Sequence, residues 1–329
     1  MGLTVAVTGP TGTFGFGLMP LLQADERIER VVGIARRSFD PAAHGWTKMA
    51  YRQGDVRDRA ALLGAFAGAD VVVHLAFMIT GTAGRESIRA INVDGTLNAF
   101  GAAAAAGAKR FVYASSVAAY GFDRENPIGM TEAWPVRRAA HLFYAQEKAE
   151  IEQLLAAQAA LHPGLDVYLL RPPIVLGPNS VGAKTFLPGP LGPLGRALVA
   201  VVGRLPVALP AIVPPLPMQF IHEQDVGEAL VLCIVGAGSP GAYNIAGDGV
   251  LTAVEVAREL GFAVLPAPPR PAQAAARLLA AVPFAPPAAE WTEAMSHPAI
   301  MDTGKAKREL DWHPRYTALQ ALRDTLSRR

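Results

Sequence analysis

The sequence contains one cysteine, Cys233, so the chain cannot form an internal disulfide. Cys233 lies in the apolar run 229–234, where a small buried side chain is expected rather than a reactive thiol. The N-terminus lacks a basic segment followed by an apolar run, so the sequence gives no support for a signal peptide. Both absences fit a reducing compartment, and the expected location is cytoplasmic.

An excess of one charge is also absent. Lys and Arg number 30 against 28 for Asp and Glu, which leaves a formal net charge of +2 and no electrostatic reason to expect a nucleic-acid partner. The most apolar stretch, 186–218, is broken by prolines and glycines and contains Arg196 and Arg204. Because a membrane-spanning helix needs about 20 mostly apolar residues, we expect no integral membrane insertion. We expect this stretch to fold over a pocket, with peripheral membrane contact as the lesser alternative.

Metal-ligand spacing is missing as well. The seven histidines are scattered, and the run His222-Glu223-Gln224-Asp225 has no ligand-spaced partner. Asp225 is better explained as the N-cap of a helix over 225–235, with Glu228 completing a capping-box arrangement. We therefore expect no metal site.

Apolar residues are abundant, at 51% of the chain against 18% charged residues, so a large core is expected. Strand-like and helix-like segments alternate through the first half. The expected strands are Leu3–Thr8, Val31–Ala35, Met49–Arg52, Val71–Leu75, Phe111–Ser115 and Val167–Arg171, and the expected helices are Leu18–Ala24, Arg59–Ala67, Thr96–Ala106 and Phe143–Gln158. This alternation predicts an α/β fold, a Rossmann-type doubly wound parallel sheet with a smaller C-terminal substrate-binding region.

The expected division of the chain follows from this pattern. Residues 1–171 form a dinucleotide-binding Rossmann domain, and 172–329 form mainly the substrate-binding region. The segment 218–246 is expected to return to the first domain, and a short helix is expected over 272–281 in a stretch rich in Pro and Ala.

A glycine-rich turn, Thr8-Gly9-Pro10-Thr11-Gly12-Thr13-Phe14-Gly15, follows the first expected strand and opens the first expected helix. Glycines permit a tight turn and let the backbone approach a pyrophosphate, which the N–H groups and dipole of the helix N-terminus then stabilise. The position of this turn predicts a dinucleotide site. The expected contacts are Gly9, Thr11, Gly12, Thr13, Phe14 and Gly15.

The end of the second expected strand bears on which dinucleotide is bound. A carboxylate there would accept hydrogen bonds from the adenosine ribose, but the chain has Arg36 and Arg37 instead. Arginine pairs with a 2′-phosphate, so NADP(H) is favoured over NAD(H). After the third strand, Asp55 beside Val56 is placed to accept from the adenine amino group, although an Asp after a glycine is as typical of an ordinary turn.

Two further segments suggest catalysis. Ser115 and Ser116 end the fifth expected strand, and Tyr144 and Lys148 lie four apart, on one face of an expected helix. A phenol exchanges a proton with a carbinol, and an adjacent ammonium is expected to lower its pKa from about 10. We expect Ser116 to hold the substrate oxygen, Tyr144 to exchange the proton, and Lys148 to tune Tyr144 and bind the nicotinamide ribose.

In these motifs and their order the chain resembles the extended short-chain dehydrogenase/reductase family, also called the NAD-dependent epimerase/dehydratase family. The matching segments are Thr8–Gly15, Gly54–Asp55, His74–Ala76, Asn92–Thr96, Ser115–Gly121, Tyr144–Lys148, Arg171–Pro173, Gly177–Pro178, Phe220–His222, Asp225–Val226, Tyr243–Ile245 and Leu310–Pro314. The resemblance implies that Ser116, Tyr144 and Lys148 are the catalytic triad and that Asn92 ties strands together. The further cofactor contacts expected are Leu75, Ala76, Phe77, Ser115, Pro172, Pro173, Ile174 and Val175.

The chain departs from the family pattern at two places. Dehydratases of the family carry an acidic pair after the catalytic serine or threonine, where this chain has Val117 and Ala118. Sugar-nucleotide epimerases place an arginine for the diphosphate where this chain has Met218 and Gln219. Two buried phosphates without basic partners would be costly, so a less charged, partly hydrophobic substrate is favoured.

We therefore expect an enzyme that transfers hydride between a nicotinamide and a ketone or secondary alcohol of a largely apolar small molecule. An epimerase with tightly held cofactor and a non-catalytic dinucleotide-sensing protein are the alternatives. The resemblance also implies a homodimer packed through the helix at 143–158, although the apolar side of that helix could equally belong to the core.

Overall fold

The computed structural model describes residues 2–79, 84–139, 142–180, 210–266 and 297–327. The expected helix at 272–281, most of the stretch 186–218, and Arg196 and Arg204 lie outside the described residues. Among the helices that the structure describes, none combines the length and apolar character needed to cross a bilayer.

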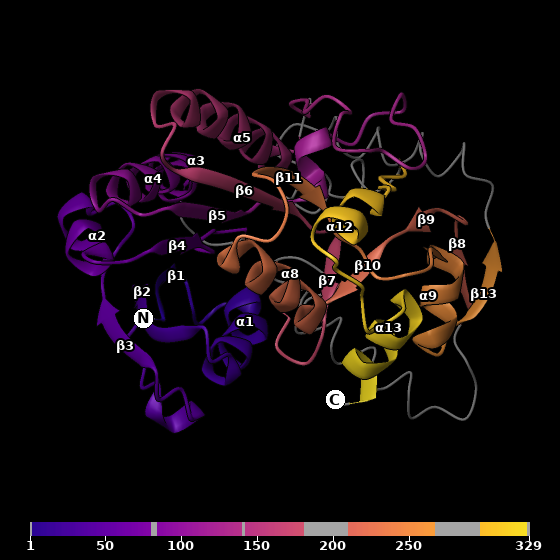
Figure 1. Cartoon of the computed structure of the whole chain (residues 1–329). Coiled ribbons are helices and arrows are strands. Elements are labelled where there is room, and N and C mark those ends of the chain that lie inside the picture. The colour runs from indigo at the N-terminus through magenta and orange to yellow at the C-terminus, as the bar shows by residue number, and fades with distance from the viewer. Residues whose placement is uncertain (1, 80–83, 140–141, 181–209, 267–296, 328–329) are drawn as a thin grey trace.

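A seven-stranded parallel sheet forms the centre of the molecule, in the order β11-β6-β5-β4-β1-β2-β3 (Figure 1). The chain leaves the central strand β1 in one direction to β2 and β3 and in the other to β4, β5 and β6. The switch point, where such folds bind ligands beyond the carboxyl ends of the strands, therefore lies between β1 and β4. The strands are β1 (Leu3–Thr8), β2 (Ile28–Ala35), β3 (Met49–Gln53), β4 (Val71–His74), β5 (Arg110–Ala114), β6 (Asp166–Arg171) and β11 (Gly241–Asn244).

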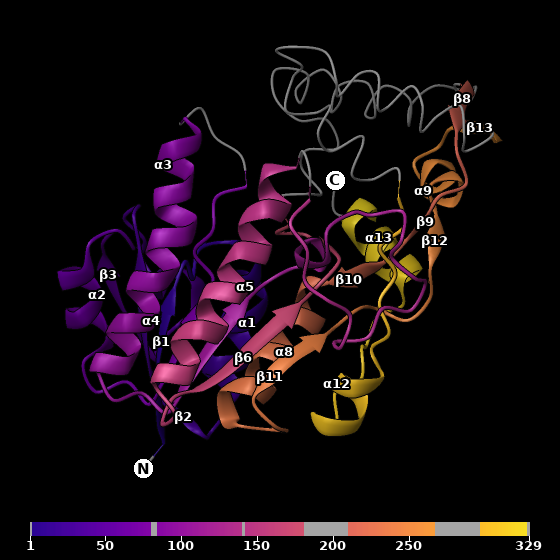
Figure 2. The same cartoon turned by 90° about the horizontal axis from the view of Figure 1, so that it is seen from above.

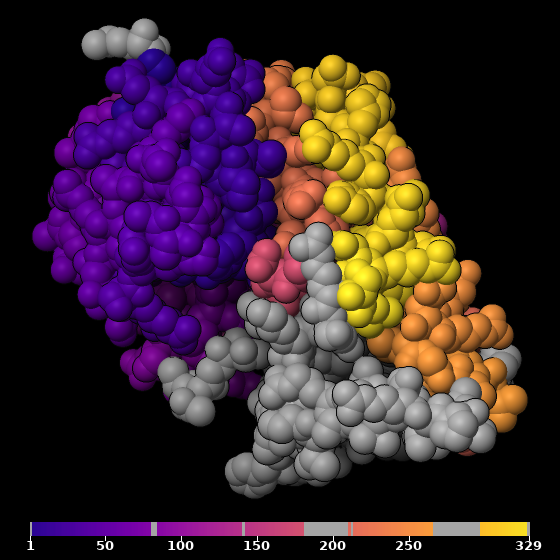
Figure 3. All heavy atoms as spheres, turned by 90° about the horizontal axis from the view of Figure 1, so that it is seen from below, coloured from indigo at the N-terminus to yellow at the C-terminus, as the bar shows by residue number. Residues whose placement is uncertain are grey.

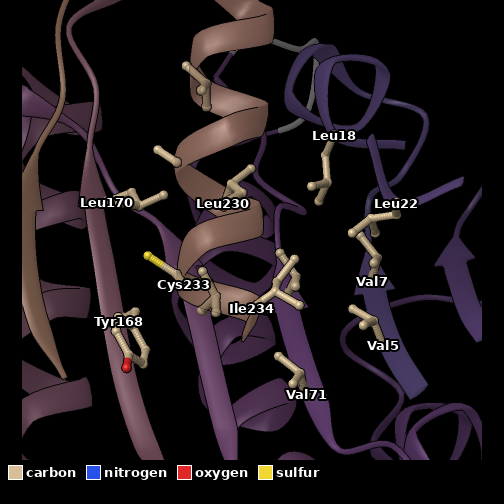
Figure 4. Close-up of a cluster of buried hydrophobic side chains, with 14 of the residues drawn as sticks. Val5, Val7, Leu18, Leu22, Val71, Tyr168, Leu170, Leu230, Cys233 and Ile234 are labelled. Atoms are coloured by element: carbon tan, nitrogen blue, oxygen red, sulfur yellow. The ribbon is translucent and has the colours of Figure 1, made fainter. Parts of the chain in front are cut away.

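Helices cover both faces of the sheet because successive strand residues point to opposite sides. Val5 and Val7 of β1 pack with Leu18 of α1 (Thr13–Ala24) and Leu230 of α8 (Glu223–Val235), as the close-up in Figure 4 shows. Ala6, between those valines, belongs to the core on the other side. That side is covered by α2 (Arg59–Phe66), α4 (Gly95–Ala105) and α5 (Phe143–Leu161). Cys233 is fully buried in the first core, and burial raises the pKa of its thiol, which confirms a packing role.

The second half of the chain builds smaller sheets beside the large one. The paired strands are β7 (Ile174–Leu176) with β10 (Phe220–His222), β9 (Pro217–Met218) with β12 (Leu251–Thr252), and β8 (Pro210–Val213) with β13 (Ala263–Pro266). Helices α9 (Ala253–Glu259), α12 (Gly304–Glu309) and α13 (Ala318–Ser327) complete this region. Figures 2 and 3 show the first half of the chain and these later elements side by side.

The predicted fold class is confirmed, but two helix starts are not where the sequence suggested. Helix α1 begins at Thr13, directly from the glycine turn, rather than at Leu18. Helix α8 begins at Glu223, and its N-cap is His222, whose Nδ1 accepts from the backbone N–H of Gln224 at 3.2 Å.

The expected role of Asp225 as an N-cap is therefore wrong. Asp225 lies inside the first turn of α8, and its carboxylate accepts the backbone N–H groups of Arg315 at 2.8 Å and Tyr316 at 3.2 Å. Glu228 does not complete a capping box either, because it pairs with Arg315 at 2.6 Å. The carboxylates that looked like local capping residues instead anchor the distant segment that precedes α13.

Candidate active site

The glycine turn after β1 has a shape that only glycine allows at two positions. Gly9 has φ +67°, and a Cβ on it would stand 2.9 Å from the backbone nitrogen of Ala76. A Cβ on Gly15 would stand 2.0 Å from the carbonyl oxygen of Pro10. Gly12 N donates to Gly9 O at 3.1 Å, which closes the turn, and Phe16 N donates to Gly12 O at 3.0 Å, where α1 begins. The turn is thus a backbone cradle that fits a dinucleotide pyrophosphate.

The strand ends around this turn are held by buried side chains. Thr96 Oγ1 donates to a carbonyl of the preceding turn, so it accepts from His74 Nε2–H at 3.1 Å. His74 Nδ1 then accepts from the Thr8 hydroxyl at 2.8 Å, and Thr8 Oγ1 accepts the N–H groups of Leu75 and Ala76 at 3.2 Å. Burial lowers the pKa of His74 to about 3, so the ring is neutral and purely structural. Leu75 and Ala76 are thereby fixed beside Gly9.

The end of β2 presents both predicted arginines to solvent. The backbone carbonyl of Arg36 accepts from Gln53 Nε2 at 2.9 Å, and that of Arg37 accepts from the Tyr51 hydroxyl. Asp55 is bonded to Arg57 at 2.8 Å, and this bond, with a smaller contribution from the charge of Arg36, lowers the pKa of Asp55. The carboxylate expected to meet adenine is therefore engaged by a neighbouring side chain, while the fixed backbone of 36–37 leaves two guanidinium groups at the strand edge.

The Ser116, Tyr144 and Lys148 side chains are brought together beyond the end of β5. Ser116 is the N-cap of the short helical turn η3 (Val117–Tyr120), where its hydroxyl accepts from Ala118 N at 3.2 Å. The Ser116 hydroxyl also hydrogen-bonds the Tyr144 phenol. Lys148 lies one turn further along α5 and is almost fully buried. Three groups that the sequence placed in separate motifs therefore share one site.

The pKa of the Tyr144 phenol differs from the expected one. Burial raises the pKa of Tyr144 to about 12, although the hydrogen bond with Ser116 opposes this shift. Lys148 Nζ lies 6.0 Å from the centre of the Tyr144 ring and donates to Tyr113 Oη at 2.9 Å and to Ala114 O at 2.7 Å. The expectation that Lys148 lowers the pKa of Tyr144 is wrong for this structure because the ammonium is bonded elsewhere. Burial also lowers the pKa of Lys148 to about 7, against the charges of Glu152 and Glu147.

Phe77 lies across this pair. Its ring meets Tyr144 edge-on with centroids 5.6 Å apart, and Lys148 Nζ lies 3.8 Å from its ring centre. Pro172 approaches from β6, since its carbonyl oxygen accepts from Val117 N at 2.9 Å. The following residues Pro173, Ile174 and Val175 continue from there into β7. The loop after β4 thus meets Tyr144 and Lys148 of α5, and the turn after β6 meets the Ser116 turn.

The resemblance implied that Asn92 ties strands together, but its contacts are different. It lies in a π-helical turn, η2 (Ala90–Asp94), and its amide bonds both backbone groups of Met78, at 2.7 and 2.9 Å. The same amide donates to Glu147 Oε2 at 2.7 Å. Asn92 therefore joins the loop after β4 to helix α5.

Other buried polar residues at this site were not predicted from the sequence. Tyr113 bonds Lys148, and Glu152 bonds both Ser115 and Arg171. The signal available in the sequence was a carboxylate on the same helical stripe as Tyr144 and Lys148, at spacings of four residues. Ser115 and Phe14 also differ from simple cofactor contacts. The Ser115 hydroxyl is bonded to Glu152, and the Phe14 ring packs against the first core.

Where sugar-nucleotide epimerases of the family place an arginine, this chain has Gln219, which makes a structural contact. Gln219 is buried, and its amide exchanges two hydrogen bonds with the backbone of Met301, at 2.9 and 2.8 Å. Val117 and Ala118, which replace the acidic pair, are buried. Within the residues that the structure describes, no group of three or more metal-ligating side chains is assembled.

A glycine cradle at the switch point of a doubly wound sheet, with a serine, a tyrosine and a lysine beside it, defines a dinucleotide-binding enzyme fold. The model of the NAD dependent epimerase/dehydratase family matches residues 5–246. The chain belongs to this family of NAD-dependent enzymes.

The chain is also similar to individual proteins, in sequence to some and in fold to others. An uncharacterized protein of Sinorhizobium fredii, y4nG, is 27% identical over 331 residues, 98% of this chain and 77% of that protein. Sterol demethylase protein B of Methylococcus capsulatus is 34% identical over 179 residues, so the match spans 54% of this chain and about half, 52%, of that protein. The fold matches a UDP-glucose 4-epimerase of Thermotoga maritima with a TM-score of 0.74 at 18% identity, covering 99% and 98% of the two chains.

Proposed function

We propose that this protein is an NADP(H)-dependent oxidoreductase that interconverts a ketone and a secondary alcohol on a largely apolar small molecule. The observation that carries the proposal is the Tyr144 phenol, hydrogen-bonded to Ser116 and one helical turn from Lys148. A binding protein without catalysis has no need of this group. The same arrangement offers a proton donor and a hydrogen-bond donor to one substrate oxygen.

The chemistry divides between the cofactor and the chain. The bound nicotinamide supplies hydride to the carbonyl carbon or accepts it from the carbinol carbon. In reduction, the Ser116 hydroxyl donates a hydrogen bond to the carbonyl oxygen and Tyr144 gives that oxygen its proton. Since the pKa of Tyr144 is raised to about 12, the phenol is protonated at neutral pH and ready to act as the acid. With the cofactor bound, Lys148 would hold the nicotinamide ribose.

NADP(H) is favoured by the two exposed arginines at the end of β2. Arg36 and Arg37 follow a strand end that carries no carboxylate, and their backbone is fixed by Gln53 and Tyr51. Guanidinium groups pair well with a 2′-phosphate. The family is NAD-dependent, so this preference is a property proposed for this chain.

The proposed substrate is uncharged and partly apolar. Gln219 stands where a diphosphate-binding arginine would be expected, and both ends of its amide are already bonded to Met301. Val117 and Ala118 leave no acidic pair for eliminating water. The similarity to sterol demethylase protein B supports an apolar substrate class.

The first experiment is a fluorescence titration of nucleotide-free protein with NADPH and then NADH, followed by turnover with a panel of apolar ketones. The proposal expects NADPH to bind at least about tenfold more tightly, a difference of about 1.4 kcal/mol. Oxidation of the NADPH must accompany ketone loss. Nucleotide that cannot be removed from the purified protein would favour the epimerase instead, and tight binding with no turnover of any carbonyl would favour a sensor.

We also propose a homodimer that packs through α4 and α5. A depression of about 470 Å³ between them is lined by small and polar side chains, among them Gly101, Ala104, Ala105 and Gln158. Leu161 at the end of α5 is 71% exposed. Small residues let helices of two copies approach closely. We further propose that residues 1–171 form a dinucleotide-binding part and residues 172–329 a mainly substrate-binding part.

A further inference from the structure

Glu152 is a buried carboxylate one turn beyond Lys148 on α5. Only 4% of its surface is exposed. Tyr144, Lys148 and Glu152 follow one another at intervals of four residues, so they form a single stripe along the helix. This stripe faces the ends of β5 and β6, over which α5 lies in Figure 2.

The carboxylate joins the two segments that enclose Ser116. Glu152 Oε1 accepts from the Ser115 hydroxyl at 2.5 Å and from Arg171 Nε at 3.0 Å, and Oε2 accepts from Arg171 Nη2 at 2.5 Å. Ser115 directly precedes Ser116. Arg171 directly precedes Pro172, whose carbonyl oxygen receives the N–H of Val117. Glu152 is thus bonded to the chain on both sides of the serine turn.

The network continues without an unsatisfied charge. Arg171 Nη1 donates to the Tyr120 hydroxyl at 2.7 Å, and that hydroxyl donates to Asn244 Oδ1 at 2.8 Å. All of these side chains are buried. Tyr120 ends the η3 turn that Ser116 begins, so the pair Glu152–Arg171 is bound to both ends of that turn.

The same carboxylate bears on the charge of Lys148. The charges of Glu152 and Glu147 of α5 raise the pKa of Lys148, and the charge of Lys148 lowers that of His74 of β4. The phenols of Tyr113 of β5 and Tyr144 of α5 also face Lys148, and Arg171 of β6 pairs with Glu152. His74 is neutral, and both tyrosines hold their protons. Burial raises the pKa of Glu147, which bonds Asn92, whereas Glu152 is paired with a guanidinium. Of the two carboxylates, Glu152 has the larger effect on the pKa of Lys148, and it also bonds the segments around Ser116.

We propose that Glu152 is a positioning residue of this active site. Through Ser115 it sets where Ser116 stands relative to Tyr144, and through its charge it keeps Lys148 an ammonium. The inference rests on the proposed roles of Ser116, Tyr144 and Lys148, and it assigns to Glu152 no contact with substrate or cofactor.

The first part of the proposal, that Glu152 positions Ser116 through Ser115, is tested with Ser115→Ala, which removes one hydroxyl and keeps the Glu152–Arg171 ion pair. We expect kcat to fall about tenfold or more, since small misplacements of a reacting group are costly. KM and the NADPH dissociation constant should stay within threefold. Ser115→Thr, which keeps the hydroxyl, should restore most of kcat. Unchanged kcat in Ser115→Ala, or a loss confined to cofactor affinity, would overturn this part.

The second part of the proposal, that the charge of Glu152 keeps Lys148 protonated, is tested with Glu152→Gln, which removes the carboxylate charge and keeps an oxygen for Ser115 and Arg171. The NADPH dissociation constant is measured by fluorescence from pH 5.5 to 9.5. We expect affinity to be lost at a pH at least about half a unit lower than in the wild-type protein, because Lys148 gives up its proton more readily. An identical profile in both proteins would overturn this part.

Two variants guard against a purely structural effect. Tyr120→Phe removes a hydroxyl from the same network but leaves Glu152 untouched, so it should lower thermal stability without moving the pH profile. Glu152→Asp keeps the charge but draws it back from Ser115, so kcat should fall with the profile unmoved. If the wild-type protein reduces no ketone, the proposed function fails, while the pH dependence of NADPH binding still decides the role of Glu152.

Discussion

Gly17 of α1 and Gly227 of α8 meet backbone to backbone where the two helices cross. A Cβ on Gly17 would stand 2.2 Å from the carbonyl oxygen of Glu223, and one on Gly227 would stand 2.3 Å from the carbonyl oxygen of Gly17. The crossing holds the N-terminus of α8, which follows β10, against the helix that opens at the dinucleotide cradle. Close approach of α8 to α1 therefore joins the second half of the chain to the cofactor side of the first.

Replacement of Gly227 by alanine should push these helices apart. The new methyl group meets backbone, which cannot move aside as a flexible side chain can, so we expect a loss of at least about 2 kcal/mol in the free energy of unfolding. Urea denaturation measures it. Gly64→Ala is the matched control, because Gly64 is an exposed helical glycine whose Cβ would meet only the end of Arg52 at 3.5 Å. The control should be neutral or slightly stabilising, and equal effects in both variants would refute the argument.

Tyr144→Phe should reduce turnover by at least about 100-fold, on the scale expected for loss of an acid–base group. NADPH affinity should be mostly kept, since the lost hydroxyl faces Ser116. Steady-state kinetics with a reduced ketone and a fluorescence titration check the two statements. Tyr168→Phe serves as control because its hydroxyl bonds the distant carbonyl of Gly238, at 3.2 Å. Near-normal turnover of Tyr144→Phe would remove the catalytic assignment.

Arg36→Ala should weaken NADPH binding about tenfold, or about 1.4 kcal/mol, and leave NADH binding within twofold. The reason is that only NADPH carries the 2′-phosphate. Arg30→Ala, at an exposed position earlier in the same strand, is the control and should change neither affinity. A parallel loss of both nucleotides in Arg36→Ala would mean that the arginine supports the loop rather than the phosphate.

Local patterns were enough to predict the sheet and the cradle. Short β-branched runs such as 71–73 and the glycine turn after β1 determine their own structure, and the described strands begin and end within a few residues of the predicted ones. The central serine, tyrosine and lysine were found for the same reason, since each lies in a contiguous motif. The motifs do not reveal how far apart these side chains lie in the folded protein.

Contacts over long separations explain the failures. Asp225 looked like a cap because a carboxylate followed by Glu228 is a local signature, yet its partners lie near residue 315. Lys148 was expected to tune Tyr144 and bind the nicotinamide ribose, and its bond to Tyr113 of a neighbouring strand was not predicted. The pairing of β8 with β13 joins segments whose sequences show no sign of each other.

Asp225 should make stability depend on pH. Burial raises its pKa to about 6, although hydrogen bonds from Arg315 and Tyr316 oppose the shift. Because the folded protein then binds a proton that the unfolded chain releases near pH 4, this residue stabilises the fold at low pH and loses that contribution as pH rises through about 6. The wild-type protein should lose up to about 3 kcal/mol more than Asp225→Asn between pH 4 and 7.

Urea denaturation of both proteins at several pH values tests this difference. Asp248→Asn is the control because Asp248 is largely exposed and pairs with Lys307 at the surface. It should follow the wild-type curve. Parallel curves for wild type and Asp225→Asn would show that the carboxylate is ionised throughout, held so by the N–H groups of 315–316.

Ala104→Arg should separate the proposed dimer. Ala104 lines the depression between α4 and α5, and a guanidinium placed there would be buried without a partner when two copies pack face to face. We expect the dimer dissociation constant to rise at least about 100-fold, or about 2.7 kcal/mol. Light scattering at micromolar concentration should then report one chain instead of two. Ala24→Arg, on an exposed end of α1 across the sheet, should leave two chains together. A wild-type protein with the mass of one chain would end the dimer proposal.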